Sequence, residues 1–276
     1  MPADVADSAG RRLPALCDRD TPKTVRRCLA SWSTLHRWKG IADRSPRPSL
    51  RSALRLAVRA SPRPRQRKSK RAVTRDVLDR LIATCATDRL ADTRDLAILL
   101  LAFASVGRRR SEVARLRVEQ LRDEPQARLD PRAPKSSTLP CLANELGRTK
   151  TGNADEEGRA LLVGPPVEAL RKCLERADIT KRPIFRAIDR WEGVEEKALT
   201  PQSINLIVKR RCAVAGLEPE GFSAHGLRAG YLTEAARQGV SLPQAMQQSQ
   251  HRSVQQAASY YNETDRTMGK AARLAI

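Results

Sequence analysis

The sequence predicts a mainly α-helical protein with a small antiparallel β-sheet (an α+β fold), preceded by a small all-α domain. Apolar residues recur at spacings of three and four along most of the chain, which is typical of amphipathic helices. Between residues 145 and 163 this spacing gives way to two strand-like segments around a turn. A basic, proline-containing stretch, residues 59–71, has the composition of a linker. We therefore expect two domains, residues 1–70 and 71–276.

The N-terminal region is expected to hold two or three helices. The first is predicted over residues 24–39, where the apolar stripe comprises Val25, Cys28, Leu29, Trp32, Leu35 and Trp38. A second amphipathic helix is predicted over residues 50–58. We expect Trp32 and Trp38 to pack in a core, because apolar residues at helical spacing usually do so.

The second domain begins with a helix that Thr74 can cap and that extends to about Cys85. Asp92 and Asp95 resemble a capping box at the start of the next helix. Residues 96–103 are apolar on all sides, which predicts a buried central helix. Gly107 is expected to end it, and a short helix follows from about Ser111.

A β-hairpin is predicted from residues 145–150 and 158–163, with a turn over 151–155. Helices are then expected at 165–177, at 201–215 behind a Thr200 cap, at 225–238 behind a Ser223 cap, and at 243–248, 253–262 and 267–276.

The charge of the chain points to a polyanionic partner. The sequence has 52 Lys and Arg against 31 Asp and Glu, a formal net charge of +21. Such a field favours double-stranded DNA and makes binding depend strongly on salt. In the linker, the basic residues expected to contact the DNA backbone are Arg65, Arg67, Lys68, Lys70 and Arg71; Arg148 of the predicted hairpin is a further candidate.

Other features narrow the partners and the compartment. The sequence has no run of about 18 apolar residues that could span a membrane and no signal-peptide pattern at its start. Its six cysteines show no C-x-x-C spacing, so we expect reduced thiols in a cytoplasmic, nucleoid-associated protein. The sequence has no Walker-type loop, and its three histidines have no partner at metal-ligand spacing, so we expect neither ATP nor a metal ion as cofactor.

A set of residues suited to phosphodiester chemistry remains. Arg109 follows the predicted central helix, at a turn where a rigid scaffold meets a loop. His225 and Arg228 are three residues apart and share one face of a helix. His251 precedes the last part of the chain, where Tyr260 and Tyr261 stand side by side. Cationic and imidazole donors can hold phosphate oxygens, and a phenol can supply the nucleophile.

In this order and spacing the residues resemble the catalytic domain of the tyrosine recombinases, the phage integrase family. The resemblance covers about residues 72–265 and rests on Gly107-x-Arg109-x-Ser111-Glu112, Lys150, His225-x-x-Arg228, His251 and Tyr260, nine residues after His251. The family spacing favours Tyr260 over Tyr261 and Arg109 over its neighbours Arg108 and Arg110. Tyr231, inside the preceding helix, is expected to pack. The chain departs from the family pattern at Gln250, where a glycine is usual, and in its short N-terminal region.

The resemblance implies a role for each residue. Arg109, Arg228 and His251 would bind the scissile phosphate, His225 would take the tyrosine proton, and Lys150 would protonate the leaving 5′ oxygen. Glu112 would orient the arginine and the histidine. Tyr260 would hold the DNA as a 3′-phosphotyrosine, without metal or ATP. The family also implies a site-specific recombinase that acts as a tetramer, with residues 267–276 docking into a neighbouring subunit.

Two other functions use the same residue types. A type IB topoisomerase would relax supercoils with one such site. A non-catalytic or degenerate relative would bind DNA through its charge without cleaving it.

Overall fold

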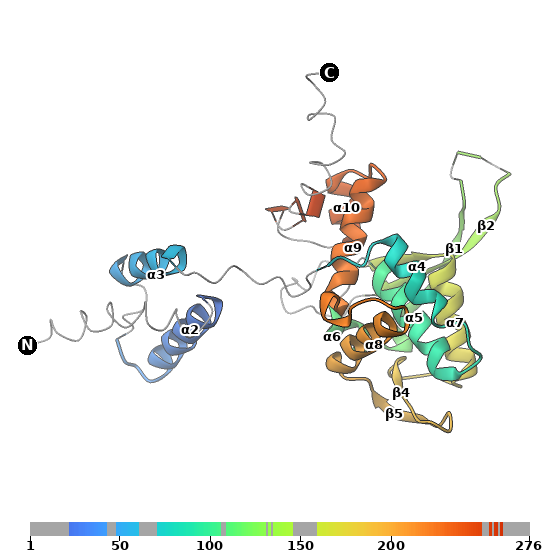
Figure 1. The fold of residues 1–276 in the computed structure, drawn as a ribbon, viewed down its shortest axis with the longest axis horizontal. Helices are drawn as coiled ribbons and strands as arrows, with labels where there is room; N and C mark the ends of the chain where they lie inside the picture. The colour runs from blue at the N-terminus through green and yellow to red at the C-terminus, as the bar shows by residue number, and fades with distance from the viewer. Residues whose placement is uncertain are drawn as a thin grey trace, which may run out of the picture. The chain divides into compact units, whose positions relative to one another are not determined.

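The computed structural model describes residues 22–42, 48–60, 71–105, 109–130, 132–133, 135–145, 159–249, 254–255, 257–258 and 260–261 (Figure 1). The chain divides into two compact units, Met1–Arg67 and Lys68–Ile276. Each unit is described by itself.

The first unit contains two described helices, α2 (Pro22–Trp38) and α3 (Pro48–Ala60). Val25 and Leu29 of α2 pack against Leu50, Ala53 and Leu54 of α3. The expectation that the tryptophans join this core was wrong, because Trp32 is 61% and Trp38 80% exposed. The described residues of α3 cover only the first half of the apolar stripe on α2, so the second half faces outward.

The second unit is mainly helical with small antiparallel sheets, which confirms the predicted fold class. Its helices are α4 (Arg75–Ala83), α5 (Leu90–Ala104), α6 (Arg110–Ala114), α7 (Pro165–Arg176), α8 (Pro201–Val214), α9 (Ala224–Arg237) and α10 (Leu242–Ser249). Two short 3-10 turns, Val118–Gln120 and Pro219–Gly221, join them. The strands are β1 (Leu121–Arg128), β2 (Thr138–Glu145), β3 (Arg159–Val163), β4 (Arg186–Ile188) and β5 (Val194–Ala198). Among the described residues, β1-β2-β3 form one antiparallel sheet and β4-β5 another.

Helix α5 is the centre of this unit, as the apolar run of residues 96–103 predicts. Ala97, Ile98, Leu99 and Leu101 are fully buried. Residues of α4, α6, α7, α8 and α9 and of the inner strands pack around it in one core cluster (Figure 1). A helix that is apolar all round can lie only inside such a shell, and its two ends therefore mark opposite edges of the domain.

The β-structure differs from the prediction in position. The strand that pairs with β3 is β2, which ends at Glu145 where the predicted strand begins; Cys141 lies opposite Val163 and Glu145 opposite Arg159. Residues 146–158, which include the predicted turn, are outside the described part. The outer strand β1 and the β4-β5 pair were not predicted.

The predicted capping box at Asp92 and Asp95 is wrong. Helix α5 begins at Leu90, whose backbone N–H donates to the carboxylate of Glu192 at 2.7 Å. Asp95 is fully buried and accepts hydrogen bonds from three guanidinium groups, those of Arg94 (2.7 Å), Arg210 (2.6 Å) and Arg211 (2.7 Å). Asp92 also pairs with Arg211. These acids therefore tie α5 to α8 instead of capping their own helix.

A backbone segment at the start of the second unit lies directly on α9. Arg71 N donates to Gly221 O and Val73 N donates to Gly226 O, both at 2.9 Å. Gly230 lies one turn after Gly226 and faces this segment. Because glycine has no side chain, the two backbones can come close together there. A Cβ added there would overlap the carbonyl group of Val73.

Gly230→Ala is expected to lower the free energy of unfolding by about 3 kcal/mol, the upper range for overpacking. In an unobstructed helix the same change would raise stability by about 0.5–1 kcal/mol. Chemical denaturation of the full chain measures the difference. A variant as stable as the wild type would show that the Val73 segment can move away from α9 at little cost.

Candidate active site

Arg109, at the start of α6, is held by Glu112, three residues further along the chain. Glu112 Oε2 accepts from the Arg109 backbone N–H at 3.0 Å, and Glu112 Oε1 lies 3.8 Å from the Arg109 guanidinium. The Arg109 side chain is 59% exposed. The carboxylate thus orients the arginine at the end of the buried helix α5 and leaves its guanidinium accessible.

His225 and Arg228 lie in the first turns of α9, as predicted. His225 is exposed and Arg228 is partly buried. Burial lowers the pKa of Arg228, while Glu112 raises it, Arg109 lowers it and Tyr260 raises it, in decreasing order of effect. Arg228 is therefore within electrostatic range of groups from the start of α6 and from the last described turn of the chain. An arginine stays protonated under such a shift, because its ordinary pKa lies far above neutral pH.

The neighbouring tyrosines have different surroundings. Tyr261 is 8% exposed, belongs to an apolar cluster with Leu232, Ala235 and Ala245, and its hydroxyl donates to Val240 O at 3.1 Å. Tyr260 packs at the edge of this cluster and is only partly buried. Tyr261 therefore has a packing role, whereas Tyr260 is the tyrosine within range of Arg228.

Tyr231 packs as expected. Its ring lies edge to face against Phe103 with centroids 6.1 Å apart, and burial raises its pKa.

Several predicted site residues lie outside the described part of the chain: Lys150, His251, Arg148, Arg65, Arg67, Lys68 and Lys70. Lys150 belongs to the connection between Glu145 and Arg159, which are paired ends of β2 and β3. Strand β3 is joined in turn to α10, where Gln248 Nε2 donates to Leu161 O at 3.0 Å. Arg71 is described, and its guanidinium lies 5.9 Å from the ring centroid of Phe222.

Helix α8 supports both arginine-bearing elements, a role that the sequence did not reveal. Gln202 Oε1 accepts from the Arg110 guanidinium at 3.2 Å, next to Arg109. Asn205 Oδ1 accepts from Ala224 N, the first residue of α9, at 3.0 Å. Ser223 occupies the predicted N-cap position, but its side chain makes no capping bond. The cap of the helix that carries His225 and Arg228 therefore comes from Asn205.

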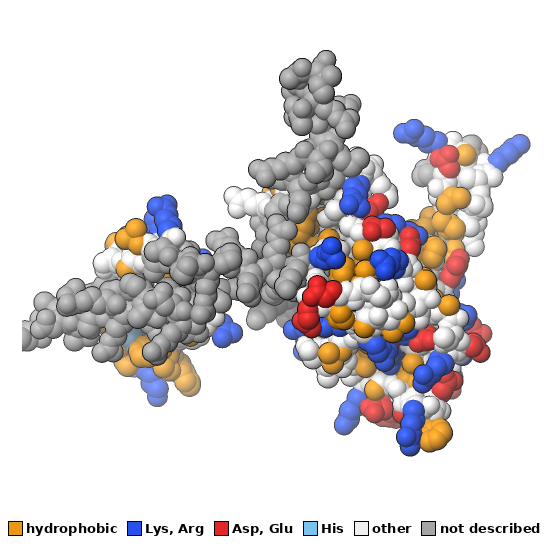
Figure 2. Space-filling model, viewed as in Figure 1, with side chains coloured by type: hydrophobic (Ala, Val, Ile, Leu, Met, Phe, Trp, Pro, Cys, Tyr) orange, Lys and Arg blue, Asp and Glu red, His pale blue; other side chains and the backbone are white. Residues whose placement is uncertain are grey.

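The charge on the surface is less segregated than the net charge suggests. Figure 2 shows Lys and Arg interspersed with Asp and Glu on the visible face of the second unit. Within the described ranges no helix is long and apolar enough to cross a membrane. The same residues contain no group of three or more His, Cys, Asp and Glu able to hold a metal ion.

The arrangement is suited to an anion that carries a reactive centre. Two guanidinium groups come from different elements, Arg109 from the start of α6 and Arg228 from α9, and Arg228 is within electrostatic range of both Arg109 and the Tyr260 phenol. Arginine donors match the geometry of phosphate oxygens and can hold two at once. A phenol beside them can attack the bound phosphorus while the arginines stabilise the developing charge.

The chain is similar in sequence to known recombinases. The chain is 28% identical to an integrase/recombinase XerD homologue from Selenomonas ruminantium over 90% of its own length and 70% of the relative. It is 27% identical to the recombinase Cre of Escherichia phage P1, over 91% of the chain and 74% of the relative.

The fold is also similar to solved structures. XerH, a site-specific recombinase bound to its difH substrate after cleavage, matches with a TM-score of 0.55 at 17% identity, over 75% of this chain and 54% of that chain. XerA recombinase matches with a TM-score of 0.51 at 18% identity, over 97% and 89%. The sequence profile of the phage integrase family matches residues 71–267, most of the chain. The protein therefore belongs to the phage integrase family.

Proposed function

We propose that this protein is a site-specific DNA recombinase that cleaves and rejoins DNA through a covalent 3′-phosphotyrosine. The observation that carries the proposal is the position of Arg228 on α9, within electrostatic range of Arg109 and Glu112 at the start of α6 and of Tyr260 near the last described residues. The XerD homologue and Cre, matched over most of both chains, support recombination over topoisomerase-like relaxation.

In the proposed reaction, Tyr260 attacks the scissile phosphorus. A P–O bond to tyrosine forms and the P–O5′ bond breaks, so the number of phosphoester bonds is unchanged. His225 takes the tyrosine proton, and Lys150 donates a proton to the departing 5′ oxygen. Arg109, Arg228 and His251 hold the non-bridging oxygens. Attack by a 5′ hydroxyl of another strand reverses the step and joins new partners.

The proposed substrate is double-stranded DNA, bound by a tetramer of two dimers in the cytoplasm. Related structures contain such substrates, as the XerH complex with difH does. Residues 267–276 would dock into a neighbouring subunit, and the basic residues of 65–71 with Arg148 would contact the DNA backbone. Binding through these charges should weaken steeply as salt rises.

The function is tested by trapping the covalent intermediate. A pool of duplexes with a randomised core and a nick near the expected cleavage point is incubated with the full chain in EDTA without ATP. Cleavage releases a short fragment, so the adduct cannot be rejoined and survives SDS. We expect an adduct whose DNA is attached through its 3′ end, and sequencing of the trapped DNA identifies the preferred site.

Other outcomes would reject the proposal. DNA binding without any adduct from the pool would favour a non-catalytic relative, and a 5′ linkage would exclude this chemistry. With the recovered site placed twice on a supercoiled plasmid, exchange between the copies is expected. Relaxation without exchange would favour the topoisomerase-like reaction.

Asn205→Ala is expected to slow adduct formation about 5-fold, because losing the cap of α9 costs about 1 kcal/mol and loosens the helix that bears His225 and Arg228. Asn205→Asp keeps the acceptor oxygen and should retain the wild-type rate. Single-turnover cleavage on the nicked duplex compares them. If Asp and Ala slow cleavage equally, the cap does not position these residues.

A further inference from the structure

A cleft lies at the other end of α5 from Arg109. It has a volume of about 410 Å³ and is lined by Arg89, Ala91, Asp92, Arg94, Ile188, Asp189, Arg190, Arg210 and Arg211. Helix α5 is 15 residues long, which separates its ends by about 22 Å. The cleft is therefore distinct from the candidate active site.

Two of its arginines form a fixed wall. Arg94 donates to Asp95 and to Arg186 O, and Arg211 donates to Asp95, Asp92 and Thr84 O. Both side chains are buried. Because the N–H groups of these two arginines donate to atoms of the protein, Arg94 and Arg211 contribute positive potential to the cleft but few hydrogen-bond donors for a ligand.

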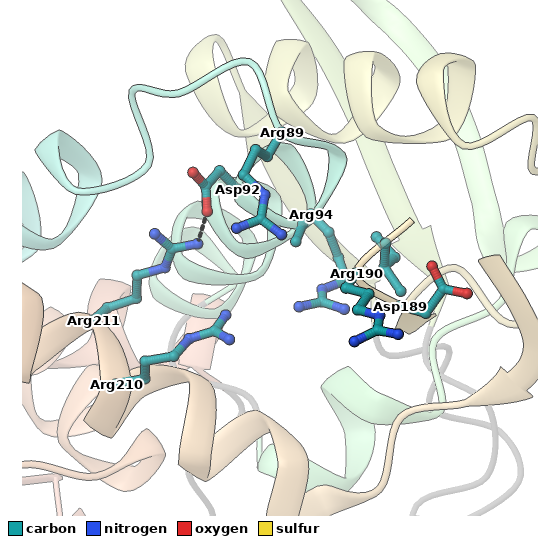
Figure 3. Close-up of a pocket in the computed structure, with 9 residues that line it drawn as sticks. Arg89, Asp92, Arg94, Asp189, Arg190, Arg210 and Arg211 are labelled. Carbon is teal, nitrogen blue, oxygen red and sulfur yellow. Dashed lines mark hydrogen bonds and ion pairs between the residues drawn. The ribbon is translucent and has the colours of Figure 1, made fainter. Parts of the chain in front are cut away.

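Three other arginines keep donors for a ligand. The guanidinium groups of Arg89 and Arg190 make no hydrogen bond or ion pair within the described part of the chain. Arg210 uses one nitrogen for Asp95 at 2.6 Å, and its side chain is 56% exposed. Figure 3 shows these three groups facing the same open space from the residue before α5, the β4-β5 turn and α8.

The β4-β5 turn holds Arg190 in place. Asp189 Oδ1 accepts from Trp191 N at 2.7 Å and from Gly193 N at 2.8 Å, and Glu192 is bonded to Leu90 N. The Arg190 guanidinium lies 4.7 Å from the ring centroid of Trp191, which leaves its edge free. A turn fixed in this way presents its cation with little loss of entropy on binding.

The charges leave a surplus that an anion can neutralise. The lining holds five arginines against Asp92 and Asp189, a difference of +3. The adjoining Asp95 and Glu192 reduce it to +1. Since the acids bind internal donors, the surplus positive charge is concentrated on Arg89, Arg190 and Arg210.

We propose that this cleft binds a small phosphate-bearing polyanion, such as inorganic triphosphate or the triphosphate of a nucleotide. Guanidinium forks pair with phosphate oxygens two at a time. Three forks on separate elements fit a chain of phosphates better than a single anion. The proposal does not depend on the recombinase function.

Titration calorimetry of the full chain with inorganic triphosphate tests it. Arg89→Gln combined with Arg190→Gln should weaken binding roughly 10- to 100-fold, the scale for charge-assisted hydrogen bonds. Arg128→Gln combined with Arg132→Gln removes the same charge from exposed positions of the second unit outside the cleft and should leave affinity within about 2-fold. Both pairs are exposed, and thermal melts check that the folds are intact.

Several results would overturn the proposal. These are absence of triphosphate binding by the wild type, equal weakening in both double variants, or equal affinity for orthophosphate and triphosphate. A cleft variant that loses duplex DNA binding but not triphosphate binding would assign these arginines to the DNA backbone instead. Parallel titration with ATP separates the two phosphate sources: equal affinity points to the phosphate chain alone, and tighter ATP binding to a nucleotide.

As a local readout, triphosphate should change the fluorescence of Trp191, because binding draws Arg190 from its ring. The change should disappear in Trp191→Phe, while calorimetric binding remains. Fluorescence that responds equally in Trp191→Phe would place the ligand elsewhere and contradict the assignment.

Discussion

Tyr260→Phe is expected to abolish the covalent DNA adduct, with cleavage falling on the order of 10⁶-fold, the scale for removing a nucleophile. Phenylalanine keeps the ring that packs beside Leu232 and Ala245 and removes only the oxygen. The fold and DNA affinity should therefore stay close to wild type, and the loss should appear in the chemical step. SDS-resistant adduct on the nicked duplex, with DNA binding measured in parallel, checks both.

The matched control is the adjacent Tyr261→Phe. It removes a hydroxyl that donates to Val240 O at 3.1 Å, so it should cost about 1 kcal/mol of stability and leave the adduct intact. Adduct that persists in Tyr260→Phe and vanishes in Tyr261→Phe would reverse the assignment. Adduct that persists in both would exclude each tyrosine as the sole nucleophile.

Asp95→Ala is expected to lower the free energy of unfolding by about 3–5 kcal/mol, which is enough to unfold much of a marginally stable domain. The change leaves the guanidinium groups of Arg94 and Arg211 buried without their shared carboxylate. Buried charges that lose their partner carry most of their desolvation penalty unopposed. Denaturant unfolding of the full chain, followed by circular dichroism, measures the loss.

Asp79→Ala provides a comparison with the same chemical change on the surface. Asp79 pairs with Arg75 at 2.8 Å, and both side chains are largely exposed. Exposed pairs one helical turn apart contribute about 0.3–0.5 kcal/mol. If the two alanine variants differed by less than about 1 kcal/mol, the Asp95 network would not hold α5 against α8.

The fold was most predictable where one helix determines its own burial. Local sequence alone predicts the apolar run within α5. It also predicts the Thr200 cap of α8, whose side-chain oxygen accepts from Ser203 N at 3.0 Å. Strand β1 lacks that signal, since its sequence LRDEPQAR has no alternation of apolar and polar residues. Strand β1 pairs with β2, and the sequence of either segment alone does not predict this pairing. Strand β5 (VEEKA) was not predicted either, because its short, charged sequence also lacks a regular alternation of apolar and polar residues.

Long-range partners explain the other errors. Asp92 and Asp95 match a capping pattern in the local sequence. In the structure both carboxylates instead pair with Arg211, which lies 116 residues beyond Asp95. Asn205 caps α9 from another helix and belongs to no motif. The motif residues Arg109, His225, Arg228 and Tyr260 were nominated as candidates from the sequence because their order and spacing form a pattern. Their supporting residues were not, because support depends on three-dimensional packing.

The close approach at Gly230 shows that residues of the same stretch, which begins at His225, serve different purposes. In the proposed reaction its histidine and arginine take part in the chemistry, whereas the absence of a side chain at Gly230 lets the chain near Val73 lie against the helix. Selection can therefore act on these positions independently. A relative that keeps this backbone contact is therefore expected to keep a glycine at position 230 whether or not it cleaves DNA.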